Sequence, residues 1–197
     1  MKTLIFVIAI SAISLTACNN QSGDKDKAGT DTAPVAAETN MAASSPDANT
    51  QLSSSPISGI VSSYLQLKNA LANDNGKEAA DAGNAMVSAF KNFAQSSLSA
   101  EKKKTFEDIQ EDASEHAEHI AANGTNIEHQ REHFETLSKD VYDLAKTFGA
   151  GQTLYKDFCP MYNSNKGATW LSETKEMKNP YLGRKMPTCG EVKETIQ

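Results

Sequence analysis

From residue 57 onward, apolar residues recur at intervals of three and four positions in four successive stretches of the chain. This spacing is typical of amphipathic helices, because it places the apolar side chains on one face. Clusters of Asn, Asp and Gly interrupt the pattern, and Ser99 stands where an N-cap residue is expected. Short connections make neighbouring helices antiparallel, so we expect an up-down four-helix bundle. The predicted helices cover about residues 57–72, 77–95, 99–122 and 127–148.

The pattern changes after residue 150, where Pro and Gly become frequent and the single Trp occurs. Residues 153–159 and 168–172 have the composition of strands, with a polar loop at 163–167 between them. Residues 191–196 are expected to form either a last helical turn or another strand. The sequence therefore predicts a small, irregular cap over residues 151–197, folded as one unit with the bundle of residues 56–150.

The N-terminus has the pattern of a bacterial lipoprotein signal. Lys2 is followed by an apolar run at residues 4–15, too short to span a bilayer, and then by Leu15-Thr16-Ala17-Cys18. Small residues before a cysteine suit cleavage and lipidation, so we expect residues 1–17 to be removed and Cys18 to carry the lipid. The protein would then be anchored to a membrane of the cell envelope, facing the periplasm or the cell surface. The alternative is an ordinary signal peptide that happens to have a cysteine near its end.

Residues 18–55 are mostly small and polar, with almost no large apolar side chain. Such a segment buries too little surface to offset its ordering entropy, so a disordered tether is expected. The formal net charge of the chain is −6, and loss of residues 1–17, which hold Lys2 and no acidic residue, changes it to −7. An acidic protein of this kind is not expected to bind nucleic acid, and it mildly favours cationic partners such as metal ions.

Two sulfur-rich elements lie in the predicted cap, Cys159-Pro160-Met161 and Met186-Pro187-Thr188-Cys189. Thiolate and thioether ligands together select Cu(I) over harder ions. On an extended segment, positions i and i+2 point to the same side, so Cys159 and Met161 can face one point. If both elements meet, Cys159, Met161, Met186 and Cys189 would form a sulfur-rich pocket.

All four histidines lie on the third and fourth predicted helices. His133 and His119 border the apolar stripes, and we expect them to be candidate nitrogen ligands beside the sulfur pocket. His116 falls on the stripe itself, which indicates a histidine of the core. His129 stands among polar residues and is expected to face solvent. Spacing on the helices brings His129 within one turn of His133.

A different interpretation of the cysteines remains open. Once Cys18 is lipidated, Cys159 and Cys189 are the only cysteines left, and two cysteines in an oxidising compartment usually pair. A disulfide would close a loop of about 30 residues and stabilise the cap by roughly 3.5 kcal/mol in the chain-entropy model. A permanent disulfide and a thiolate metal site exclude each other.

The stretch FCPMYNSNKGATWLSETKEMKNPYLGRKMPTCGEVKETI closely resembles the C-terminal signature of an uncharacterised family of small lipoproteins. QREHFETLSKDVY resembles the helix that precedes this signature. Domains of that family also occur fused to periplasmic adaptor subunits of heavy-metal and copper efflux pumps. The resemblance covers roughly residues 55–197 and implies a periplasmic module that handles copper, with Cys159, Met161, Met186, Cys189 and His133 at the matching positions.

Two functions follow from these observations. The first is a lipoprotein that binds Cu(I) or a similar soft ion, and buffers it or passes it to an efflux adaptor. The second is a structural or partner-binding lipoprotein with a Cys159–Cys189 disulfide and no metal. We expect no enzymatic activity and no organic cofactor, because the sequence has no nucleophile elbow, HExxH, CxxC or glycine-rich phosphate loop.

Overall fold

The computed structural model describes residues 55–197. The predicted signal peptide, the lipidation site at Cys18 and nearly all of the tether lie outside this range. Within it, no helix combines the length and the apolar character that crossing a membrane requires.

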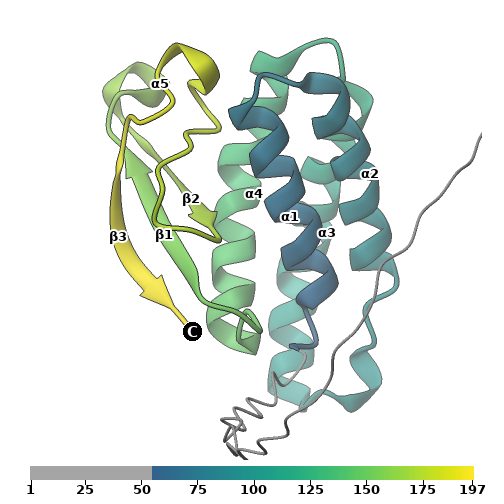
Figure 1. The fold of residues 1–197 in the computed structure, drawn as a ribbon. Coiled ribbons are helices and arrows are strands. Elements are labelled where there is room, and N and C mark those ends of the chain that lie inside the picture. Colours follow the sequence, from purple (N-terminus) through teal and green to yellow (C-terminus); the bar gives the residue numbers. More distant parts are fainter. Residues whose placement is uncertain (1–54) are drawn as a thin grey trace, which may run out of the picture. The chain divides into compact units, whose positions relative to one another are not determined.

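The predicted bundle of four helices is confirmed (Figure 1). Consecutive helices pack against each other, and the first helix also contacts the fourth. The bundle therefore forms around one shared apolar core. The helices are α1 (Ser58–Ala72), α2 (Gly76–Lys91), α3 (Ala100–Ala122) and α4 (Ile127–Phe148).

Polar side chains fix where three of these helices begin. Asn75 accepts a hydrogen bond from the Glu78 N–H at the start of α2, and Ser99 accepts one from Lys102 at the start of α3. Asn126 does the same for the N–H of His129 in α4. The second helix ends at Lys91, earlier than expected, and a 3-10 turn at Gln95–Ser97 (η1) follows.

The cap is more regular than the sequence indicated. Its two expected strands are joined by a third, so residues 191–196 form a strand rather than a helical turn. The sheet is antiparallel in the order β2-β1-β3, and a short turn, α5 (Tyr162–Asn165), follows β1. A second 3-10 turn, η2, covers Gly183–Lys185. The strands are β1 (Leu154–Cys159), β2 (Ala168–Ser172) and β3 (Glu191–Ile196).

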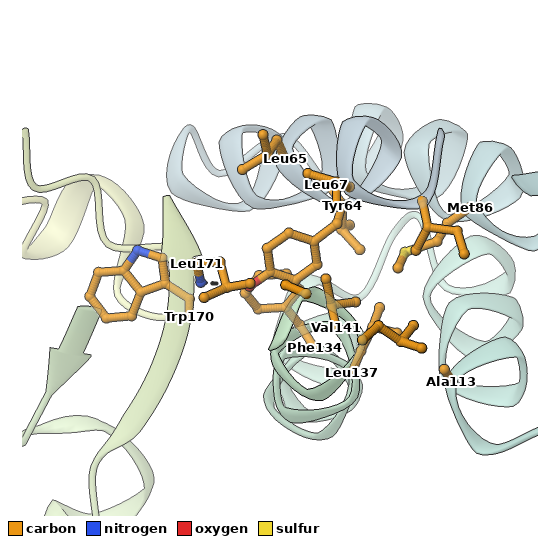
Figure 2. Close-up of a cluster of buried hydrophobic side chains, with 14 of the residues drawn as sticks. Tyr64, Leu65, Leu67, Met86, Ala113, Phe134, Leu137, Val141, Trp170 and Leu171 are labelled. Carbon is orange, nitrogen blue, oxygen red and sulfur yellow. Dashed lines mark hydrogen bonds between the residues drawn. The ribbon is translucent and has the colours of Figure 1, made fainter. Parts of the chain in front are cut away.

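The sheet packs on α1 and α4 through β2, as Figure 2 shows. Tyr64 of α1 stacks on Phe134 of α4, with ring centroids 5.3 Å apart. Its hydroxyl accepts the N–H of Leu171 at 3.0 Å and lies 2.8 Å from the Ser138 hydroxyl. Leu171 points toward the helices and Trp170 toward the other face of β2 (Figure 2). The buried Tyr64 side chain thus links two helices and the sheet.

Arg131 of α4 makes a second link between the bundle and the cap. Its side chain is buried, and it donates hydrogen bonds to the carbonyls of Pro180 (2.8 Å) and Leu71 (3.0 Å). It also forms an ion pair with Asp74 at 2.5 Å. The Arg131 guanidinium therefore bonds to three segments of the chain: α1, the turn that follows α1, and the loop that precedes β3.

Candidate metal centre

All four histidines of the chain meet between the C-terminal half of α3 and the N-terminal half of α4. His119, His129 and His133 each offer a ring nitrogen, and the three nitrogens lie within 4.8 Å of one another. We call these three residues the histidine centre. In the described part of the chain, this is the one group of at least three His, Cys, Asp or Glu side chains so arranged.

The helix geometry explains how the histidines come together. His129 and His133 are one turn apart on α4, and their Nε2 atoms lie 3.2 Å apart. The rings of His119 and His133 stack across the two helices, with centroids 4.3 Å apart. His116 joins from α3, with its Nδ1 2.8 Å from Nδ1 of His133. The turn between α3 and α4 is short, so positions close to it on either side face each other.

The surroundings of the histidine centre are acidic and partly open to solvent. The side chains of His119 and His129 are 46% and 35% exposed, so an ion can reach them. Burial, followed by the neighbouring histidines, lowers the pKa of His133 below its ordinary value. The neutral ring, which is the form that binds metals, is therefore favoured.

Two of these positions differ from expectation. His129 was expected to face solvent, yet its Nε2 points to His133, because both lie on the face of α4 that packs on α3. His116 was expected in the core, but it is half-buried at the rim of the bundle. Its Nδ1 lies within hydrogen-bond distance of Nδ1 of His133. The signal available in the sequence was the placement of all four histidines on either side of one short turn.

The cysteines meet in the cap, as both interpretations required. Sγ of Cys159 lies 2.6 Å from Sγ of Cys189, with Cys159 buried and Cys189 partly exposed. Two thiolates on one tetrahedral ion stand about 3.7 Å apart, given metal–sulfur bonds of about 2.3 Å. Burial and the neighbouring Cys159 raise the pKa of the Cys189 thiol to about 11. Both residues are free thiols in the structure. The short distance leaves no room for an ion held by both sulfurs, and the raised pKa disfavours the thiolate form that a metal requires.

Both methionines approach this pair through their backbones. Met161 is 51% exposed and lines a surface hollow with Arg131, Tyr162 and Leu182. Its backbone N–H interacts with the Cys189 sulfur. Met186 is half-buried, and its carbonyl accepts the N–H of Cys189 at 3.2 Å.

The histidine centre and the cysteine pair lie on different sides of α4. Arg131 and Glu135 face the cap, where they bond Pro180 and Asn163. His129 and His133 precede these two residues by two positions each, a rotation of about 200° around the helix axis. The expected single site, in which His133 or His119 joined the sulfur ligands, is thus divided into two separate groups.

Residues 60–153 match the model of a family described as protein of unknown function, DUF3347. The chain is therefore similar to this family over its helical part. No curated protein and no solved structure matches the chain. All four histidines lie within the matched range, whereas Cys159 and Cys189 lie beyond it. The resemblance drawn from the sequence was most specific in that C-terminal stretch, and the match instead covers the helices.

Proposed function

We propose that this protein binds a divalent transition-metal ion at the histidine centre. The observation that carries the proposal is the approach of three ring nitrogens, from His119, His129 and His133, to within 4.8 Å of one another. Histidine is the commonest metal ligand in proteins. Three nitrogens this close can converge on one ion once the stacked ring of His119 or of His133 turns toward it.

The donor set decides the class of ion. Imidazole nitrogen suits Zn²⁺, Cu²⁺ and Ni²⁺, whereas Cu(I) is selected by thiolate and thioether sulfur. The histidine centre has nitrogen ligands, so we propose a divalent ion where the sequence led us to expect Cu(I). Among divalent first-row ions the order of affinity at such a site places Cu²⁺ highest. Copper thus remains the favoured element, in its oxidised form.

The setting of the centre favours exchange over permanent storage. Three protein ligands leave a coordination position free for water or for a ligand of a second protein. The partial exposure of His119 and His129 gives that position access to solvent. We therefore propose that the protein buffers the ion or passes it on, as a lipoprotein in the cell envelope with an efflux adaptor as the partner expected from the resemblance.

The cysteine pair has a structural role in this proposal. A Cys159–Cys189 bond would join the end of β1 to the start of β3 and hold the loop between them. The metal site then needs no free thiol, and the oxidising envelope would not damage it. The second function considered from the sequence, a partner-binding lipoprotein without metal, shares this disulfide and differs only at the histidines.

The test is a titration of the purified protein with Cu²⁺ and with Zn²⁺ in competition with a chromophoric chelator. We expect one equivalent to bind, and the double variant C159S/C189S to bind it with unchanged affinity. Loss of binding in the cysteine variant would indicate that the ion binds in the cap, at the cysteines. Absence of binding in the unaltered protein would contradict the metal-binding function and favour the partner-binding function.

A further inference from the structure

The further inference concerns the second ring nitrogen of each histidine, the one that does not face the ion. A metal ligand uses one imidazole nitrogen, and a partner on the other nitrogen fixes the tautomer and the orientation of the ring. In the histidine centre, Nε2 of His133 and Nε2 of His129 face each other at 3.2 Å. Their Nδ1 atoms must therefore find partners outside the centre.

Carboxylates supply these partners for two of the three rings. Nδ1 of His129 lies 3.1 Å from Oε2 of Glu132. Nε2 of His119 lies 3.8 Å from Oε1 of Glu115, one helical turn before it. Glu132 can accept the N–H of His129, which leaves the other nitrogen of that ring without a proton. Glu115 is too far from His119 for a hydrogen bond and acts on that ring through its charge.

His133 reaches a carboxylate through a second imidazole. Its Nδ1 lies 2.8 Å from Nδ1 of His116, and Nε2 of His116 lies 3.5 Å from Oδ1 of Asp112. We infer that His116 is a positioning residue and not a fourth ligand, and that Asp112 and His116 together hold His133 ready for the ion. This inference rests on the proposed binding of an ion at the histidine centre. We call Asp112 and His116 the outer branch.

The positions of the protons decide between the two roles. One proton lies between the two Nδ1 atoms. If His133 carries it, Nε2 of His133 is bare for the ion, and His116 has its own proton on Nε2, the atom that lies 3.5 Å from the Asp112 carboxylate. If neutral His116 carries it, bare Nε2 of His116 faces the Asp112 carboxylate, and His133 has its proton on the nitrogen that faces the ion. The first arrangement satisfies all three groups, and it leaves no nitrogen of His116 for a metal.

The experiment compares Cu²⁺ affinity in three α3 variants of the full protein. We expect Asp112→Ala to weaken binding about 10–100-fold, the usual effect of losing an outer partner. Asp112→Asn should recover part of the loss, because its amide oxygen still presents a partial negative charge to Nε2 of His116. Asp108→Ala is the matched control, since Asp108 bonds Lys104 on the exposed side of the same helix. Alanine favours helix more than aspartate does, so weaker binding in Asp112→Ala would not reflect a weakened α3.

A spectroscopic measurement on His116→Gln separates positioning from ligation. The number of nitrogen ligands is read from the electron paramagnetic resonance spectrum of the Cu²⁺-loaded protein. We expect the same nitrogen count as in the unaltered protein, with weaker affinity. Loss of one nitrogen would make His116 a ligand and overturn the inference. Equal affinity in Asp112→Ala and Asp108→Ala would overturn it as well. If the unaltered protein bound no Cu²⁺, the proposed function itself would fail, and the outer branch with it.

Discussion

Nε2 of His129 lies 3.2 Å from Nε2 of His133, one turn further along α4. Two imidazoles at this distance cannot both carry a proton on the facing nitrogen without repulsion. One proton between them makes a hydrogen bond. In the proposed centre an ion takes the place of that proton, and both nitrogens then donate an electron pair to it.

The first prediction concerns these two residues as the proposed ligands. Replacement of either His129 or His133 by alanine should reduce Cu²⁺ affinity by more than about 100-fold, because a coordinating nitrogen is lost. Loss of an outer partner is expected to reduce the affinity by no more than that amount. Gln130, between them, is buried and bonds backbone carbonyls, so it is no suitable control. Thr147→Ala, later on the same helix, is the control, and competitive titration is the measurement. An affinity that survives loss of both histidines would place the ion elsewhere.

The second prediction concerns the cysteines. Protein isolated under air should contain no free thiol at Cys159 or Cys189, because their sulfurs lie 2.6 Å apart. The variant C159S/C189S should unfold with a free energy lower by about 3.5 kcal/mol, from the greater freedom of the unfolded loop. Thiol counting under denaturing conditions, and urea unfolding followed by circular dichroism, provide the two measurements. Two reactive thiols in fresh protein would contradict the bond.

The third prediction is a pH dependence of stability at Asp157. This residue is buried, and both of its carboxylate oxygens lack a hydrogen-bond partner within residues 55–197. Burial is the main cause that raises its pKa from 3.8 to about 7, against the opposing charge of Lys68. The folded state therefore holds the proton more tightly than the unfolded state. This group's contribution to stability is complete below about pH 4 and is lost as the pH rises through 7.

Asp157→Asn removes the titrating group while keeping its shape. We expect the variant to melt at a temperature roughly 5 °C higher than the unaltered protein at pH 8, and the difference to shrink as the pH approaches 4. Thermal unfolding across this range, without metal, is the measurement. A difference that stays constant with pH would show that the carboxyl is already ionised or solvated in the folded protein.

The fourth prediction concerns the contact of bundle and cap. Arg131→Met should destabilise the protein by about 2–3 kcal/mol, because the buried carbonyls of Leu71 and Pro180 lose their donor. Lys139→Ala is the matched control on α4, since Lys139 pairs with Glu135 at the surface. We expect that control to change the free energy of unfolding by less than about 0.5 kcal/mol. Urea unfolding provides both values, and equal effects would argue against a special role for Arg131.

The regular spacing of apolar residues was sufficient to predict the helices and two strands, because each element carries its own period. It was insufficient for the end of α2. Phe93 continues the apolar spacing, yet it stacks on Phe106 at 4.0 Å from beyond the helix. The strand at Glu191–Ile196 was ambiguous for a similar reason. Most of its residues are exposed at an edge of the sheet, so its burial lacks a clear alternation.

The candidate site was harder to predict, because it depends on which face of a helix meets which neighbour. Cys159 and Cys189 were correctly expected to meet, since few partners exist for either. His129 was assigned to solvent from the polar residues beside it in sequence. It also contacts His119 of α3, one helix away, and local composition carries no information about that contact.

Helix α4 has His129 and His133 on one side and Arg131 and Glu135 on the other, in a single stretch of sequence. Substitutions can change either side while the other stays intact, so the two surfaces are free to diverge independently among relatives. Insertion or deletion of one residue in this stretch is different, because it rotates everything beyond it by about 100°. Such a change would misalign the imidazoles and detach the sheet at once. We therefore expect the length of this segment to be kept among relatives even where its residues differ.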